Sequence, residues 1–269
     1  MVLTLLNGVK ISASAAGAWD GILPSANASA AFSGGDGSSA NPYLISTAAD
    51  LAQLAANVNA GIAHTNKVFV QTADIVLNDL SNVANWGTTA PANAWVPIGA
   101  SAKHFEGTFD GHGYRVSGIY TNSSAEFQGL FGCIGINGAL TNLGVANSYI
   151  KGGQYVGGIA GYCGGRVTNC YNTGAVSGTS YIGGIFGYIQ SATIANCYNT
   201  GAVSGTSYIG GIAGCLHLGS QVKYCYSTGN VIGGKTFTGG TVSNCGTIGA
   251  SQIVTAGTAG NCDTVQTLL

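Results

Sequence analysis

The stretch NCYNTGAVSGTS occupies residues 169–180 and recurs unchanged at residues 196–207. The block that precedes each copy recurs as well, as YVGGIAG from Tyr155, YIGGIFG from Tyr181 and YIGGIAG from Tyr208. An altered copy, YCYSTGNVIGGK, begins at Tyr224. A fixed period of this length is typical of a solenoid, in which each coil buries its apolar face against its neighbours.

The residue types within each period predict strands rather than helices. Short runs of Val, Ile, Tyr and Thr are separated by Gly-Gly, Thr-Gly and Ser-Gly pairs. This pattern is typical of β-strands that end in turns. We therefore predict an all-β chain, a parallel β-solenoid with about 27 residues per coil, whose clearest repeats lie in residues 127–250.

One helix is predicted ahead of the repeats. In TAADLAQLAANV, residues 47–58, apolar side chains recur three and four residues apart at Leu51, Leu54 and Val58. Thr47 is placed to cap this helix, with Asp50 three residues later. An open solenoid end exposes unpaired strand edges, so we interpret the helix as a cap.

The chain divides into three predicted parts. Residues 1–45 form an N-terminal extension, residues 46–262 form the solenoid with its cap, and residues 263–269 form a terminal strand or tail. Segments 68–70, 75–77 and 95–98 are rich in Val, Ile and aromatic residues. They are the first strands expected after the helix.

The order of several blocks resembles the GLUG-motif repeat proteins, which are cell-surface proteins of bacteria and archaea. These blocks are NPYLISTAADLAQLAANVNAG (41–61), FVQTADIVL (69–77), WVPIG (95–99), FEGTFDGHGYRVSGIY (105–120), GLFGCIG (129–135) and the repeated GGIAG and NCYNTGAVSG. The resemblance implies a right-handed parallel β-helix that forms the stalk or passenger of adhesins and other large surface proteins. Some of those proteins also carry a metallopeptidase domain, but the HExxH motif of such domains does not occur in this sequence.

The composition argues against nucleic acid as a partner and against a membrane-spanning helix. Charged residues make up 6% of the chain and the net charge is −1, which gives nucleic acid little to bind. The sequence has no run of 18 apolar residues, so we predict no membrane-spanning helix. Its eight cysteines fit an oxidising compartment at least as well as a reducing one. We therefore predict an extracellular, cell-surface location.

Acidic residues are confined to the first half of the chain and the extreme C-terminus. Between Phe127 and Cys262 there is no Asp or Glu, whereas cleavage of polysaccharide requires paired carboxylates or a metal held by them. We predict that the chain is not an enzyme and has no catalytic residue or cofactor. A polysaccharide-active β-helix enzyme is the remote alternative.

One cluster of metal-ligand residue types, KHFEGTFDGHG, contains His104, Glu106, Asp110 and His112. Even spacing would place these four side chains on one face of a strand, where a metal ion or acid–base chemistry is conceivable. Asp-Gly and His-Gly are turn dipeptides, however. The turn interpretation is favoured, and no metal site is predicted.

Several residue types recur at the coil period and predict ladders along the solenoid axis. The ladder residues are Asn169, Asn196 and Asn244; Cys170, Cys197, Cys225 and Cys245; and Tyr171, Tyr198 and Tyr226. Identical side chains one strand spacing apart can extend amide hydrogen bonds or aromatic contacts from coil to coil. Strict alternation from the strand before each cysteine directs the thiols outward, where lateral disulfides are feasible, and a turn at each Asn directs them inward.

The two ends of the chain predict self-association. The cysteine spacing shortens between Cys225 and Cys245, and no predicted helix follows to close the last coil. An apolar strand with no place in the repeat could be donated to another subunit. The predicted contact residues are Val2, Leu3, Leu5, Leu6, Val9, Ile11, Leu268 and Leu269.

The predicted function is that of a structural protein whose subunits join end to end into a surface filament. The alternative is a monomeric adhesin module that binds a glycan or a host protein, with the tyrosine rows as a sugar-binding strip.

Overall fold

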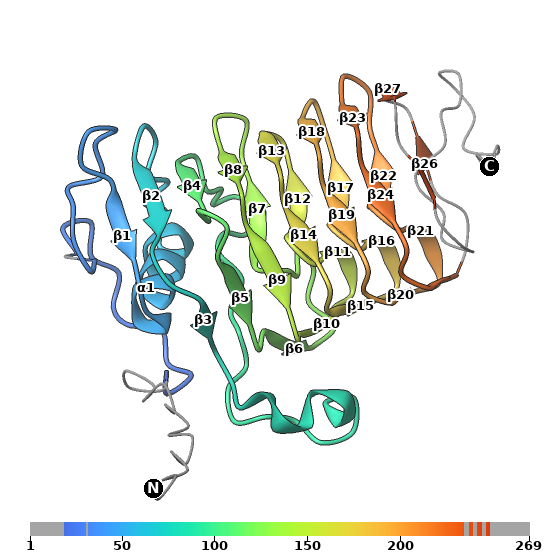
Figure 1. Cartoon of the computed structure of the whole chain (residues 1–269), viewed down its shortest axis with the longest axis horizontal. Helices are drawn as coiled ribbons and strands as arrows, with labels where there is room; N and C mark the ends of the chain where they lie inside the picture. Colours follow the sequence, from blue (N-terminus) through green and yellow to red (C-terminus); the bar gives the residue numbers. More distant parts are fainter. Residues whose placement is uncertain (1–18, 31, 234–236, 239–240, 244–245, 248–269) are drawn as a thin grey trace, which may run out of the picture.

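The computed structural model describes residues 19–30, 32–233, 237–238, 241–243 and 246–247. Strands wind along one long axis, from β1 at one end to β27 at the other (Figure 1). Every pair of neighbouring named strands in the described part of the chain is parallel. The predicted parallel β-solenoid is therefore confirmed.

A complete coil contributes one short strand to each of five sheets. In the coil that begins at Arg166 these are β13 (Arg166–Thr168), β14 (Tyr171–Asn172), β15 (Ala175–Ser177), β16 (Ser180–Gly183) and β17 (Phe186–Ile189). The next coil begins with β18 (Thr193–Ala195), which pairs with β13 so that Val167 lies opposite Ile194. Val222 lies opposite Ile194 in the following coil and Val242 opposite Val222, so the last coil is shorter than those before it.

The sheets differ in length because not every coil contributes to each of them. The first sheet contains β1 (Tyr43–Ile45), β2 (Val68–Gln71), β4 (Thr108–Asp110), β8 (Ala139–Thr141), β13, β18, β23 (Gln221–Lys223) and β27 (Thr241–Ser243). The second contains β3 (Ile75–Val76), β5 (Arg115–Ser117), β9 (Gly144–Ala146), β14, β19 (Tyr198–Asn199), β24 (Tyr226–Ser227) and β28 (Gly246–Thr247). The third contains β6 (Tyr120–Asn122), β10 (Tyr149–Lys151), β15, β20 (Val203–Ser204) and β25 (Val231–Ile232). The fourth contains β11 (Gln154–Gly157), β16 and β21 (Ser207–Gly210), and the fifth contains β7 (Phe131–Ile134), β12 (Ala160–Cys163), β17, β22 (Ala213–Leu216) and β26 (Phe237–Thr238).

The predicted helix is present as α1 (Ala48–Asn59) near the N-terminal end of the solenoid (Figure 1), and its role as a cap stays a prediction. Thr47 accepts a hydrogen bond from the Asp50 backbone, and the Asp50 carboxylate accepts one from the Thr47 backbone. This reciprocal capping box satisfies backbone groups that the first helical turn leaves open. Leu51, Leu54 and Val58 are fully buried, so the predicted apolar face packs into the core.

The first coil starts earlier than the predicted boundary at residue 46. β1 lies within the predicted extension, yet it pairs with β2, with Tyr43 opposite Phe69. The reason is that β1 satisfies its backbone groups on the edge of β2, so α1 connects two rungs of one sheet.

No membrane-spanning helix, by length and apolar character, occurs among the described helices.

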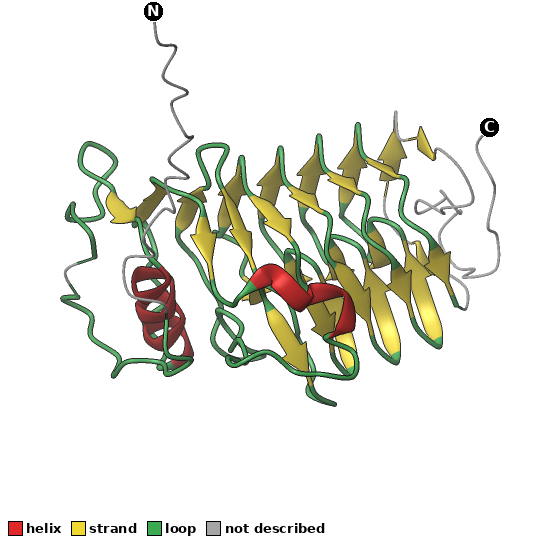
Figure 2. Ribbon diagram, turned by 60° about the horizontal axis from the view of Figure 1, so that its bottom comes forward, coloured by secondary structure: helices red, strands yellow, loops and turns green. Residues whose placement is uncertain are grey.

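Two of the three strands expected after the helix are confirmed as β2 and β3, and the third is wrong. Residues 95–98 form only an isolated bridge from Ile98 to Phe131. Pro97 has no N–H to donate to a ladder, which explains why pairing does not extend through this segment. Ahead of it, the chain leaves the solenoid body in a lateral excursion that contains the 3₁₀ segment η1 (Leu80–Asn85) (Figure 2).

Candidate functional site

The exposed asparagine ladder forms where each coil turns from the first sheet to the second. Asn169 donates to Asn142 Oδ1 over 3.0 Å, and Asn196 donates to Asn169 Oδ1 over 3.1 Å. These three residues have φ between 52° and 55°, the left-handed conformation that asparagine tolerates best after glycine. The predicted Asn244 and Cys245 lie outside the described residues.

The left-handed asparagines decide the direction of the cysteines. The conformation reverses the alternation of the preceding strand, so Cys170 and Cys197 point inward and are fully buried. Tyr224, with a φ of 53°, takes the place of the asparagine before Cys225, which is 1% exposed. Cys170 and Cys197 are free thiols, and each donates to the carbonyl two residues before it, over 3.3 Å. Contact with the Cys170 thiol, with burial, raises the pKa of Cys197 well above its usual range. The outward alternative, with lateral disulfides, is wrong for this row.

A second buried ladder was not predicted, although its residues lie in the quoted repeat. Asn172 and Asn199 are fully buried, and Asn172 Nδ2 donates to Asn199 Oδ1 over 3.0 Å. Each side chain also closes its own turn by bonding the residue two places later, Gly174 or Gly201. The ladder thus satisfies polar groups inside every coil that contains it.

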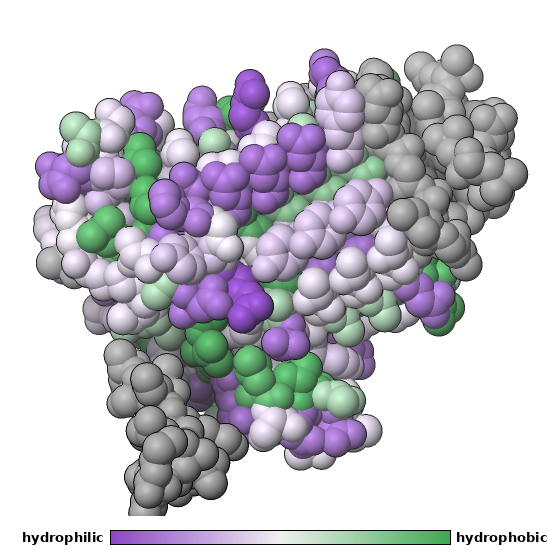
Figure 3. All heavy atoms as spheres, in the orientation of Figure 1, coloured by the Kyte–Doolittle hydropathy of each residue, from purple (hydrophilic) through white to green (hydrophobic). Residues whose placement is uncertain are grey.

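The predicted tyrosine row stacks. Tyr171 and Tyr198 have ring centroids 5.0 Å apart with 8° between their planes, and Tyr198 and Tyr226 follow at 5.3 Å and 6°. Rows of similar residues run along the long axis as bands of one colour (Figure 3).

The predicted contact residues Val2, Leu3, Leu5, Leu6, Val9, Ile11, Leu268 and Leu269 lie outside the described part of the chain.

A longer stack, which we call the ring column, was not predicted. It consists of Phe127, Tyr155, Tyr181 and Tyr208, with centroids 4.9, 5.0 and 4.7 Å apart and planes within 11° of parallel. All four residues have φ between 56° and 59°. The recurrence of Tyr155, Tyr181 and Tyr208 at the head of the YxGGIxG block was the available signal. Phe127 could not be assigned because its block, FQGLFG, differs.

A mixed row lies beside the ring column. It runs through His104, Tyr162, Tyr188 and His217, with centroids 5.7, 6.0 and 5.9 Å apart. Tyr188 meets Tyr155 edge to face at 5.7 Å, which joins the two rows into one aromatic surface. Burial raises the pKa of Tyr188 to about 12, so its hydroxyl stays protonated at neutral pH.

The cluster predicted from KHFEGTFDGHG holds turns. Asp110 accepts hydrogen bonds from the His112 backbone at 2.8 Å and from Asn142 Nδ2 at 3.0 Å. Glu106 accepts one from the Asn137 backbone at 2.8 Å. The turn at Asp110 is confirmed, and no group of three metal-ligand side chains occurs anywhere in the described residues.

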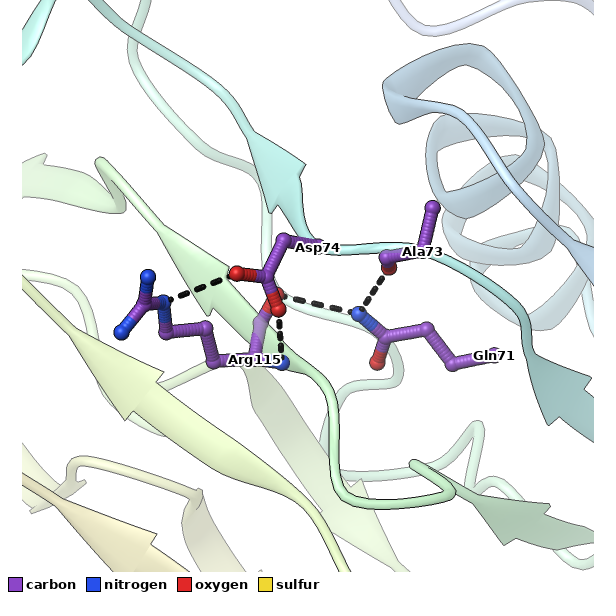
Figure 4. Close-up of polar contacts among 4 residues, drawn as sticks. All are labelled: Gln71, Ala73, Asp74 and Arg115. Atoms are coloured by element: carbon purple, nitrogen blue, oxygen red, sulfur yellow. Dashed lines mark hydrogen bonds and ion pairs between the residues drawn. The ribbon is translucent and has the colours of Figure 1, made fainter.

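Other carboxylates have similar structural roles. Asp74 forms an ion pair with Arg115 Nε at 3.1 Å and accepts the Arg115 N–H at 3.1 Å, while Gln71 donates to the carbonyls of Ala73 and Arg115 (Figure 4). Asp20, Asp36 and Asp79 each accept a backbone N–H two residues ahead. Among the described residues, Glu126 is the one carboxylate to which the structure gives no hydrogen bond or ion pair.

A pocket of about 460 Å³ opens at the head of the ring column. Its walls come from segments far apart in sequence: Asn59 at the end of α1, Val96 and Pro97, residues 99–103, and residues 126–128. Asn59 fixes this arrangement, because its side chain donates to the Pro97 carbonyl and accepts from the Gly99 N–H, while Lys103 Nζ donates to the Asn59 carbonyl.

Comparison with known proteins agrees with this architecture. Residues 205–232 match the family model described as the GLUG motif. The chain contains a GLUG motif. The matched GLUG segment runs from β21 to β25 and is therefore one complete coil of the solenoid. The resemblance to GLUG-motif proteins is confirmed.

Two curated relatives match over part of their length. A protein of Evansella cellulosilytica named "Putative Gly-rich membrane protein" is 36% identical over 123 residues, which is 45% of this chain and 13% of the relative. Halomucin of Haloquadratum walsbyi is 31% identical over 146 residues, 54% of this chain and 2% of that protein. The chain thus spans a small part of either relative.

One solved structure has the same fold. It is described as a "putative immunoglobulin A1 protease" from Bacteroides ovatus and aligns with a TM-score of 0.63 over 87% of this chain and 85% of that one. At 23% sequence identity the likeness concerns the fold alone.

Proposed function

We propose that this chain is a non-catalytic structural segment of an extracellular cell-surface protein. The observation that carries the proposal is the placement of its carboxylates. All those described, except Glu126, hold a turn, a helix cap or an ion pair of the scaffold, and the repeated coils contain none. General acid–base chemistry on a glycan needs two carboxylates that face a shared substrate.

The ladders support a mechanical role. The two coils with identical repeats each add a member to the asparagine, cysteine and tyrosine rows, so each of them contacts mainly its nearest neighbours. Such a stack resists bending and can be lengthened without a new core. The names of the curated relatives, a membrane protein and a halomucin, are in keeping with a place at the cell surface.

We further propose that copies associate end to end. β21 is the last described strand of the fourth sheet, and β27 is the last of the first sheet. Edge strands offer unpaired backbone groups that pair readily with a strand from another chain. In residues 2–11, Val9 and Ile11 alternate with polar residues after the apolar residues of 2–6, which suits a donated strand.

Negative-stain microscopy tests the association. The purified chain should form rods whose length exceeds one molecule and grows with protein concentration, and deletion of residues 1–16 should leave single short rods. Uniform short rods from the intact chain at every concentration would contradict end-to-end assembly, and unchanged long rods after the deletion would contradict strand donation.

Substrate screens test the absence of catalysis separately. Incubation with pectin, alginate and immunoglobulin A1 should leave each substrate intact by gel and mass spectrometry. Cleavage that copurifies with the chain and disappears in Glu126→Gln would overturn the non-catalytic assignment.

A further inference from the structure

Within the described part of the chain, no further ring stacks on Phe127, which ends the ring column at the pocket. Tyr155 has a near-parallel ring on both sides, Phe127 at 4.9 Å and Tyr181 at 5.0 Å, and Tyr181 is likewise flanked by Tyr208. Parallel rings this close must overlap face to face, so the inner rings present mainly their edges and hydroxyls to solvent. The ring column therefore cannot bind ligands on its ring faces along its whole length.

Phe127 differs from the inner rings. Tyr155 lies against one face of Phe127, and on the other side comes the coil that contains residues 96–103, since Ile98 is bridged to Phe131. The pocket is lined by that preceding coil together with residues 126–128. The column thus ends at Phe127, and Phe127 contributes to the lining of the pocket.

The polar groups at the pocket are few and of both signs. Glu126, whose carboxylate accepts no hydrogen bond within the described chain, shares the lining with Lys103. Glu126 is close enough to the column to raise the pKa of Tyr155, an effect that adds to burial. Opposite charges in one lining disfavour a strongly charged ligand of either sign.

We propose that this pocket binds a neutral pyranose of a glycan, with the apolar face of the sugar on Phe127 and its hydroxyl groups donating to Glu126. A hexose complements both groups of the site. Its C–H face can pack on the Phe127 ring, and its hydroxyl groups can donate hydrogen bonds to the Glu126 carboxylate. The volume of about 460 Å³ is within the range of small-ligand sites. An aromatic side chain of a second copy would bury the carboxylate without a donor, which is unfavourable.

The site is built for binding rather than cleavage. One carboxylate, Glu126, lines the pocket, whereas glycoside hydrolysis uses a pair. The pocket is also preformed, because Asn59, Gly99 and Lys103 hold the loop over residues 99–103 by hydrogen bonds. A rigid site avoids the entropy of ordering a loop on binding. This inference does not depend on end-to-end assembly.

Saturation-transfer NMR and calorimetry on the full chain test the proposal. The probes are glucose, galactose, mannose, N-acetylglucosamine, cellobiose and N,N′-diacetylchitobiose. At least one should bind saturably, and Glu126→Gln should weaken that affinity at least fivefold. Phe127→Leu should weaken it at least tenfold, whereas Phe127→Tyr, which keeps the ring, should stay within twofold of the natural chain.

Tyr208→Leu is the matched control, since it removes a ring from the far end of the same column. Its affinity should be unchanged, and circular dichroism should show the solenoid intact in every variant. The surface variant Glu126→Gln keeps the test valid if Phe127→Leu fails to fold. Absence of saturable binding by all six sugars, affinity insensitive to Glu126→Gln, or equal losses at Phe127 and Tyr208 would each overturn the proposal.

Discussion

Asn172 donates from Nδ2 to Oδ1 of Asn199, one coil further along, over 3.0 Å, with both side chains fully buried. The same two amides close the turns at Gly174 and Gly201. This buried ladder therefore couples the local shape of each turn to the stacking of neighbouring coils.

Asn199→Ala should destabilise the chain by about 1–3 kcal/mol, because it leaves the Gly201 N–H and carbonyl buried without their partner. Urea unfolding measures the change. The control is Asn196→Gly in the exposed ladder, where glycine accepts the φ of 54° and the expected change is below about 0.5 kcal/mol. Equal losses in the two variants would show that burial of the ladder is unimportant.

Gly184→Ala should lower the free energy of unfolding by an amount near the upper end of the range of about 1–3 kcal/mol. A Cβ at Gly184 would meet the Asn199 side chain and the Gly211 carbonyl, and neither can move without disturbing a ladder. Gly164→Ala is the control, because its Cβ would make only ordinary contacts with Tyr162 and Gly135. Thermal unfolding should separate the two variants clearly, and similar melting temperatures would contradict the close packing at Gly184.

The buried thiols should resist alkylation in the folded chain. Burial raises the pKa of Cys133 and of Cys163 to about 12, so almost no thiolate exists at pH 8. Iodoacetamide at that pH should leave Cys133, Cys163, Cys170 and Cys197 unmodified in native protein and modify all four in urea, as read by peptide mass spectrometry. Rapid native modification would contradict the burial of these thiols, and a Cys170–Cys197 disulfide in protein purified without reductant would contradict their free state.

His64 should make the stability of the chain depend on pH. Its ring is packed against Phe32 and Phe69, and burial, followed by the charge of Lys67, lowers its pKa from 6.5 to about 4. The unfolded chain therefore binds the proton more readily than the folded chain. The contribution of neutral His64 to the free energy of unfolding is fully present above pH 6.5 and is lost as the pH falls from 6.5 to 4. The expected loss is about 3 kcal/mol.

The variant His64→Asn isolates this contribution, since asparagine accepts the φ of 56° found at this position. Unfolding free energies measured from pH 7 to pH 4 should fall less steeply in the variant than in the natural chain. Parallel curves would show that His64 does not titrate with folding.

The class of fold could be predicted from the order of residues. The identical blocks at residues 169–180 and 196–207 require identical local structure, and their strand-and-turn composition leaves stacking as the way to bury their apolar residues. The helix α1 was equally predictable, because Thr47, Asp50 and the apolar spacing after them act within a few residues. The turn at Asp110 followed from the same kind of local signal.

The direction in which side chains face, in contrast, depends on how the coils are assembled. Cys170 points inward because of the left-handed φ of Asn169, a backbone conformation that an alternating pattern does not reveal. Likewise, each repeat offers two asparagines, and packing inside the coil selects Asn172 as the buried one. The pocket joins residues 59, 96–103 and 126–128, which only the winding of successive coils brings together. Contacts between distant segments follow from coil register and loop path, and these are properties of the assembled stack rather than of any local stretch of sequence.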